Sequence, residues 1–290
     1  MSIDHTTLAD QVAALAAQGE RIETPGPEGP MVWHRFGSRA GRPLMLFHGG
    51  WGSWTHWFKA IPTLAEQFTV YAADTPGLGD SAVPSEPHTA DGIAAIMGDG
   101  ITHLLGPDEG FHLAGFSFGG LLGSVVARNM AGRCQSFTAV GASGFGHLHD
   151  PPRGTALATP DMTDDEVDDL QRRNLEILMF KDPAKIDDLA IHMHRQNLAR
   201  GRVRSRPISL TDALLRALPD IKAPIAGIWG EFDATASRPG ALEMRAEIFS
   251  NHQPNAPFHI IPDAGHWVMY EGAEPFTAAL IDVLKSLPPY

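Results

Sequence analysis

The amino-acid sequence predicts an α/β protein: a mostly parallel, doubly wound sheet with an inserted helical cap. Three observations lead to this prediction. Short apolar runs such as PLMLF at 43–47 alternate with stretches of helical periodicity, as in βαβ units. Glycine-rich and polar loops follow several of these runs, at the strand ends where open α/β sheets bind ligands. The segment 145–217 carries helical patterns but no convincing strand.

The expected helices and strands follow in chain order. The first helix has Leu8, Val12 and Leu15 on one face, and Gly19 is its stop signal. Residues 43–47, PLMLF, form a continuous apolar run, typical of a parallel strand that is buried on both faces. We expect strands at 31–37, 43–47, 69–77, 111–115, 137–143, 223–230 and 258–263. We expect helices at 6–18, 54–66, 90–105, 121–130, 240–250 and 275–287.

Residues 145–217 are expected to form the cap, over a core made of residues 1–144 and 218–290. Thr163 and Glu166 have the spacing of a capping box ahead of an amphipathic stretch. Asp182 and Pro183 mark the start of a second helix. Helices inserted between two core strands are most simply placed over the strand ends.

Composition limits the class of partner. The chain has 290 residues, 43% of them hydrophobic, and a net charge of −12. This acidity argues against nucleic acid and against anionic membrane surfaces as partners. Cys134 is the single cysteine, as expected in a reducing compartment. No signal peptide and no apolar run of roughly 18 residues is found. We therefore expect a cytoplasmic protein with a small-molecule substrate, and monomer and homodimer both remain open.

The stretch Phe111 to Gly120, FHLAGFSFGG, contains a G-x-S-x-G pattern centred on Ser117. An apolar strand precedes the pattern and a helix follows it, as a nucleophile elbow requires. Such a tight turn forces the serine into a strained conformation, which small neighbours two residues away make possible. Backbone N–H groups at the start of the helix are then free to receive negative charge. The sequence predicts that Ser117 is a nucleophile.

Two later strand ends supply partners for this serine. Asp233 follows IAGIWGEF, and His266 follows HIIPDAG. A serine needs a base to take its proton, and the base needs a carboxylate to hold its tautomer and stabilise its charged form. The order Ser117, Asp233, His266 is that of one architecture in particular. Asp150 and Asp263 are less suited as the acid, because Asp150 lies in the insertion and Asp263 is too close to His266 in sequence.

The loop HGGWG at 48–52 follows the strand at 43–47. A backbone N–H of Gly50 or Trp51, together with that of Phe118, would give two donors to an oxyanion. The pocket is expected to be lined by His48, Gly49, Phe116, Trp267 and Arg195.

The histidine pairs His147-x-His149 and His192-x-His194 do not predict a metal site. Helical residues two apart point about 200° away from each other, so His192 and His194 cannot hold one ion together. We expect no metal and no cofactor.

Taken together, these motifs resemble the α/β-hydrolase superfamily over nearly the whole chain. HGGWG resembles its oxyanion loop, and DTPGLGDS at 74–81 its D-x-P-G-x-G-x-S segment. GFSFGG resembles the nucleophile elbow, IWGEFD the strand that leads to the acid, and AGHWVMYEGAEPF the histidine loop. The resemblance implies the α/β-hydrolase fold with a helical cap. A serine nucleophile sets the chain apart from the dehalogenase and epoxide-hydrolase branches, which use aspartate.

The sequence predicts a serine hydrolase that cleaves a small, largely apolar carboxylic ester or acyl compound. His266-Trp267 and the arginine-rich insertion are also similar to carbon–carbon bond hydrolases of ring-cleavage products, which hold a substrate carboxylate with a cap arginine. Those enzymes usually carry Asn before the nucleophile, where this chain has Phe116. A third hypothesis is a ligand receptor that keeps the fold without turnover.

Overall fold

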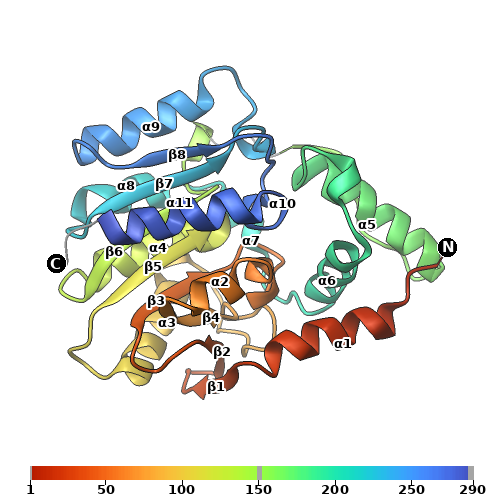
Figure 1. Ribbon diagram of the computed structural model, residues 1–290, viewed down its shortest axis with the longest axis horizontal. Coiled ribbons are helices and arrows are strands. Elements are labelled where there is room, and N and C mark those ends of the chain that lie inside the picture. The colour runs from red at the N-terminus through yellow and green to blue at the C-terminus, as the bar shows by residue number, and fades with distance from the viewer. Residues whose placement is uncertain (1, 149–151, 287–290) are drawn as a thin grey trace.

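The computed structural model describes residues 2–148 and 152–286. Its centre is an eight-stranded sheet in the order β1-β2-β4-β3-β5-β6-β7-β8 (Figure 1). The strands are β1 Glu20–Thr24, β2 Met31–Phe36, β3 Arg42–Phe47, β4 Phe68–Ala73, β5 Phe111–Phe116, β6 Cys134–Val140, β7 Ile225–Gly230 and β8 Phe258–Ile261. Strands β1, β2 and β4 pair antiparallel, whereas β4, β3, β5, β6, β7 and β8 pair parallel in succession. The predicted mostly parallel, doubly wound sheet is confirmed.

The described helices lie on both faces of this sheet and beyond one of its ends (Figure 1). They are α1 His5–Ala16, α2 Ile61–Ala65, α3 Ala90–Leu105, α4 Phe118–Asn129, α5 Asp164–Leu178, α6 Asp188–Ala199, α7 Ser205–Ser209, α8 Ala213–Ala217, α9 Ala241–His252, α10 Val268–Glu271 and α11 Ala273–Ser286. One apolar core joins the sheet to α3, α4, α8 and α9, through side chains such as Met97 and Leu121. A second core joins the other face to α2, α10 and α11, through Ile61 and Leu280.

The structure differs from the predicted elements at several places. Strand β1 falls in a region for which no strand was predicted. The helix expected at 54–66 is a 3-10 turn at Trp54–Trp57, capped by Ser53, followed by the short α2. The strand expected at 137–143 runs from Cys134 to Val140, because Gly141 has a left-handed φ of 48° and turns the chain out of the sheet.

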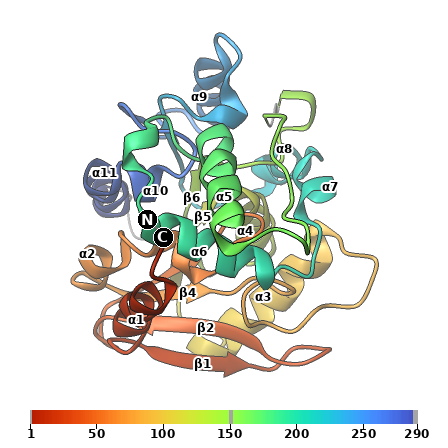
Figure 2. The same ribbon diagram turned by 90° about the vertical axis from the view of Figure 1, so that its right-hand side faces the viewer.

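Between β6 and β7, the described residues form helices α5 to α8 and no strand. The capping box of Thr163 and Glu166 is present at the start of α5. Asp182 caps only a 3-10 turn, and the next helix starts at Asp188 behind its cap Asp187. Helices α5 and α6 lie beyond one end of the sheet, the end at which the chain passes from β8 to α10 (Figure 1). Figure 2, viewed from that end, shows both helices in front of the strands. We refer to the described part of 145–217 as the cap; its division from the core remains a prediction.

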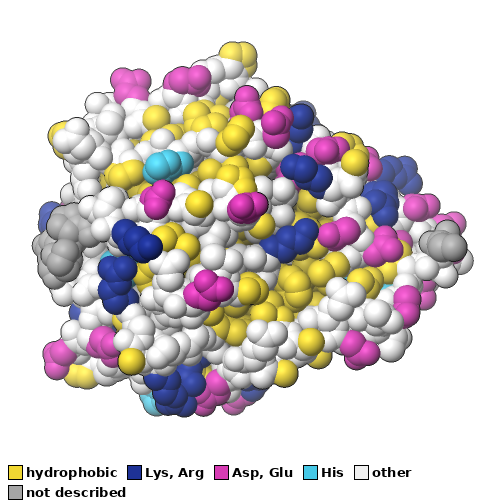
Figure 3. Space-filling view, in the orientation of Figure 1, with side chains coloured by type: hydrophobic (Ala, Val, Ile, Leu, Met, Phe, Trp, Pro, Cys, Tyr) yellow, Lys and Arg dark blue, Asp and Glu magenta, His cyan; other side chains and the backbone are white. Residues whose placement is uncertain are grey.

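Acidic and basic side chains are interspersed on the face drawn in Figure 3. Among the described helices, none combines the length and the hydropathy required to cross a bilayer.

Candidate active site

Ser117 lies at the tight turn between β5 and α4. Its φ of 50° and ψ of −114° are unfavourable for a residue with a Cβ. Its neighbours leave no space for larger residues: a Cβ on Gly115 would overlap the carbonyl oxygen of Gly119. A Cβ on Gly119 would lie 2.5 Å from the carbonyl oxygens of Phe47 and His48. The G-x-S-x-G pattern is therefore a packing requirement of this turn.

The turn brings Ser117 to two side chains from distant strand ends. His266 Nε2 lies 3.1 Å from Ser117 Oγ. On its other side, His266 Nδ1 lies 2.9 Å from both carboxylate oxygens of Asp233. Both His266 and Asp233 are buried, at 2% exposed each. The structure thus brings together the three residues predicted to form the triad.

Asp233 lies in an environment that favours its charged form. Burial alone would raise its pKa, but the charge of His266 and hydrogen bonds from His266 and Thr235 outweigh burial, so the pKa of Asp233 is lowered. Thr235 donates to Asp233 Oδ1 through both its backbone N–H and its hydroxyl, at 2.8 Å each. A carboxylate held in this way can fix the imidazole tautomer with Nδ1 protonated and Nε2 facing the serine.

The residues predicted to donate to an oxyanion either follow Ser117 directly or line its pocket. Phe118 is the first residue of α4, so its N–H has no partner within the helix. Gly50 and Trp51 line the same pocket as Ser117, and Trp51 has a left-handed φ of 53°. Both Gly50 and Trp51 remain candidates for the second donor.

Two buried histidines form hydrogen bonds with the backbone of the HGGWG loop. His48 Nδ1 donates to the carbonyl of Gly49 at 2.7 Å, and its Nε2 accepts from the N–H of Thr75 at 2.9 Å. His56 Nδ1 accepts from the N–H of Gly49 at 3.2 Å. Burial lowers the pKa of His48 to about 4 and that of His56 well below its usual value. Both rings are therefore neutral at physiological pH, as these accepting nitrogens require.

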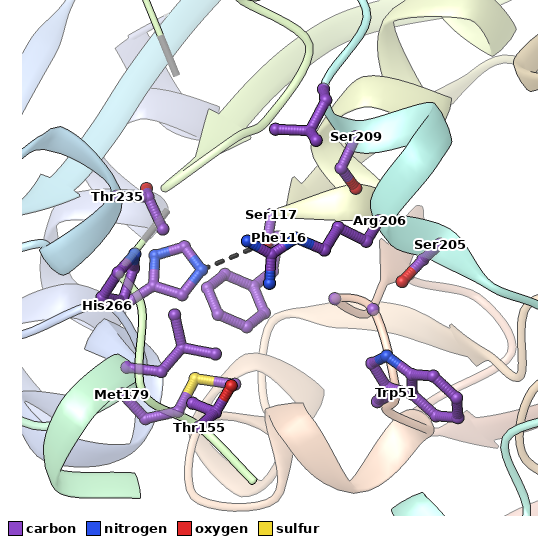
Figure 4. A pocket seen from close by; sticks show the side chains of 15 residues that line it. Trp51, Phe116, Ser117, Thr155, Met179, Ser205, Arg206, Ser209, Thr235 and His266 are labelled. Atoms are coloured by element: carbon purple, nitrogen blue, oxygen red, sulfur yellow. Dashed lines mark hydrogen bonds between the residues drawn. The ribbon is translucent and has the colours of Figure 1, made fainter. Parts of the chain in front are cut away.

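A pocket of about 170 Å³ opens in front of Ser117. Figure 4 shows His266 bonded to Ser117, with the ring of Phe116 beside them and the guanidinium of Arg206 extending towards the serine. The core supplies Gly49, Gly50, Trp51, Phe116, Ser117, Thr235 and His266 to the lining. The cap supplies Pro152, Thr155, Leu178, Met179, Ser205, Arg206, Ser209 and Leu210. The pocket therefore lies between the sheet and the cap.

Of the five residues predicted to line the pocket, Gly49 and Phe116 do so and the other three do not. His48, the first residue of the HGGWG loop, is fully buried, and its ring nitrogens bond to the backbone of Gly49 and Thr75. Trp267 is 1% exposed and donates its indole N–H to the carbonyl of His56 at 2.8 Å. Arg195 contacts Asp168 at 2.6 Å and Asp164 at 2.7 Å. These partners hold its guanidinium between α5 and α6, which corrects the prediction for Arg195.

Another arginine of the same arginine-rich insertion lines the pocket in place of Arg195. Arg206 lies on α7, and within residues 2–148 and 152–286 its guanidinium has no hydrogen-bond or ion-pair partner. Ser205 and Ser209 on the same short helix also line the pocket. These two serines, four positions apart, share one helical face, whereas Arg206 lies about 100° round the helix from Ser205, so no local pattern in the sequence marked Arg206.

The remaining candidates lie elsewhere. Asp263 is exposed and pairs with Lys181 at 3.4 Å. His149 and Asp150 lie outside the described residues. Among the residues that the structure does describe, no three His, Cys, Asp or Glu side chains cluster in a way that could hold a metal ion.

Comparison with known proteins identifies the family. The model of the alpha/beta hydrolase family matches residues 44–279. The chain is 27% identical to the 2-hydroxy-6-oxo-6-phenylhexa-2,4-dienoate hydrolase of Burkholderia cepacia, over 85% of this chain and 88% of the relative. Its fold resembles a carboxylesterase from Bacillus subtilis (TM-score 0.72, 22% identity, covering 97% and 96% of the two chains). It also resembles a meta-cleavage product hydrolase from Pseudomonas fluorescens (TM-score 0.71, 20% identity, 89% and 95%). The chain therefore belongs to the alpha/beta hydrolase family.

Proposed function

We propose that this member of the family is a cofactor-free serine hydrolase that cleaves a small, largely apolar carboxylic ester or related acyl compound. The observation that carries the proposal is the continuous contact from Ser117 through His266 to Asp233, at 3.1 and 2.9 Å, beside a pocket. Hydroxyl attack on a carbonyl needs this arrangement of nucleophile, base and orienting carboxylate.

In the proposed reaction, His266 Nε2 takes the hydroxyl proton as Ser117 Oγ attacks the ester carbonyl. The N–H of Phe118, together with that of Gly50 or Trp51, stabilises the negative oxygen of the tetrahedral intermediate. His266 then protonates the departing alcohol, which leaves an acyl group on Ser117. A water molecule that gives its proton to the same imidazole attacks this acyl group, and His266 then returns that proton to Ser117 Oγ as the acid is released. Asp233 remains ionised throughout and stabilises the imidazolium.

Replacing the nucleophile tests this mechanism. Ser117→Ala should lower kcat for p-nitrophenyl acetate and butyrate by roughly 10⁴-fold or more, because no other hydroxyl can form the acyl-enzyme. Ser124→Ala is the matched control: this buried serine of α4 bonds the carbonyl of Leu121 at 2.7 Å and should leave kcat unchanged. Near-wild-type turnover by Ser117→Ala would contradict the proposal, whereas tight ligand binding without turnover by the wild type would favour the receptor hypothesis.

Carbon–carbon bond hydrolysis of a vinylogous diketone acid is the second candidate. The observation that favours it is Arg206, whose guanidinium extends into the pocket (Figure 4) and has no partner among the residues that the structure describes. Guanidinium groups bind carboxylates strongly, and the Burkholderia cepacia relative is named for a dienoate. Phe116 weighs against this candidate, because its side chain offers no hydrogen bond where those hydrolases usually have Asn.

A further inference from the structure

The residues that directly follow the HGGWG loop are bonded to the cap. Asn197, on α6, is fully buried. Its Oδ1 accepts from the hydroxyl of Ser53 at 2.7 Å, and its Nδ2 donates to Thr55 Oγ1 at 3.1 Å. The two hydroxyls also lie 2.8 Å apart. A buried network of this kind, in which each member bonds the other two, fixes the positions of its members.

Two further cap residues contact the loop itself. Trp51 packs so closely on Gly201 that a Cβ there would lie 2.7 Å from the ring atom Cζ3. Ser205 packs against Gly50, and a Cβ added to Gly50 would overlap the hydroxyl of Ser205. Figure 4 shows Ser205 beside Trp51. The left-handed φ of Trp51 therefore occurs at the point where cap residues pack against the loop. Such strain persists only where surrounding contacts over-determine the conformation.

The cap segment that makes these contacts is itself fixed to the core. The N–H of Arg202 donates to the carbonyl of Gly77 at 2.9 Å. Its guanidinium donates to the carbonyls of Gly79 at 2.8 Å and Ser81 at 2.7 Å. Residues 197–205 thus bridge the loop after β3 and the loop after β4.

We propose that Asn197 is a positioning residue, which holds Gly50 and Trp51 in the conformation that presents the N–H of one of them to the oxyanion. The inference rests on the proposed function, because it assigns a cap residue to the proposed oxyanion hole. Asn197 acts through Ser53 and Thr55 and does not contact the substrate. Because donors to an oxyanion act only in the correct geometry, a small displacement of the loop lowers the rate without weakening ground-state binding.

Asn197→Ala tests the assignment. With p-nitrophenyl butyrate, kcat should fall about tenfold to hundredfold, because losing or misplacing an oxyanion donor has effects of this size. KM should stay within about twofold of wild type. The inhibition constant of an alkyl trifluoromethyl ketone, which forms a tetrahedral adduct with the serine, should rise by the same factor as kcat falls.

Ile191→Ala is the matched control for a merely structural effect. Ile191 is a fully buried residue of the same helix that lines a separate depression with Ile3 and Asp168. This variant should lower the melting temperature without changing kcat or the inhibition constant. If Asn197→Ala fails to fold, Ser53→Ala removes the 2.7 Å bond from the loop side but leaves the bond between Asn197 and Thr55, and it should lower kcat in the same way but by less.

Failure of the role assigned to Asn197 can be distinguished from failure of the proposed function. Asn197→Ala or Ser53→Ala with wild-type kcat and wild-type inhibition by the ketone would overturn the role of Asn197 while leaving the serine hydrolase proposal intact. A wild-type protein that neither turns over the ester nor binds the ketone would overturn the proposed function itself.

Discussion

Ser117 is held in its strained conformation by backbone contacts on both sides of the turn. Its N–H donates to the carbonyl of Val140 at 2.9 Å, and its carbonyl accepts from the N–H of Ser143 at 3.0 Å. Both contacts come from the end of β6 and the turn after it. These bonds offset the cost of the unfavourable backbone angles, which is about 1–3 kcal/mol for such a residue. The hydroxyl is thereby presented to His266 before any substrate binds.

Phe116 determines the character of the pocket wall beside the serine. It is fully buried, with its ring centroid 4.8 Å from that of His266 and 5.5 Å from that of His56. An aromatic wall at this point favours an apolar acyl group and offers no donor to a polar one. Arg206 is the opposing feature, since it offers a cation to the same pocket.

Substitution of Arg206 distinguishes the two substrate classes. If the substrate carries a carboxylate, Arg206→Gln should lower kcat/KM for the acidic mono-p-nitrophenyl succinate about tenfold to hundredfold, the loss of one charge-assisted contact. The neutral p-nitrophenyl butyrate should change by less than about twofold. The exposed Arg204, which does not line the pocket, supplies the control variant Arg204→Gln, and this variant should affect neither ester. Equal losses on both esters in Arg206→Gln would count against carboxylate recognition.

At the scale of elements, most strands and helices could be predicted because their periodicity and end signals are local. The limits of elements were harder to predict where two signals compete. Asp182 and Asp187 are both suitable helix caps, and only Asp187 starts a full helix. Strand β1 has the burial pattern of an exposed edge strand, and the charged sequence ERIET gives no continuous apolar run to detect.

The candidate site was predictable in the core and not in the cap. Ser117, Asp233 and His266 follow strands of one parallel sheet, whose carboxyl ends meet at the same edge. No such rule orients the cap helices relative to the core. Arg195 and Arg206 belong to one arginine-rich stretch, and which of them faces the pocket depends on how α5, α6 and α7 pack.

At the scale of the whole molecule, burial makes the fold sensitive to acid. Burial lowers the pKa of His34, His48, His112 and His194 from 6.5 to about 4. The unfolded chain therefore binds more protons than the folded chain between pH 6.5 and 4. Asp74 has the opposite effect on proton uptake, because burial raises its pKa to about 6 and the folded chain then binds the extra proton. The four histidines together outweigh this single carboxyl group.

The free energy of unfolding should accordingly be retained above about pH 6.5 and fall as the pH drops towards 4. His194→Leu should make this dependence shallower by up to about 1.4 kcal/mol per pH unit, because one fewer proton is bound on unfolding. His103→Gln, at an exposed position of α3, is the control and should leave the slope unchanged. Urea unfolding measured at several pH values gives the slopes, and a wild-type stability that does not change over this range would contradict the prediction.

Covalent labelling tests whether Ser117 is an activated nucleophile in the pocket between the sheet and the cap. A fluorophosphonate probe that forms a bond with activated serines should add one adduct per chain of wild-type protein. Mass spectrometry of the digested protein should place the adduct on Ser117, and Ser117→Ala should take up none. An adduct on another residue of the wild type, or full labelling of Ser117→Ala, would contradict the assignment of Ser117 as the nucleophile.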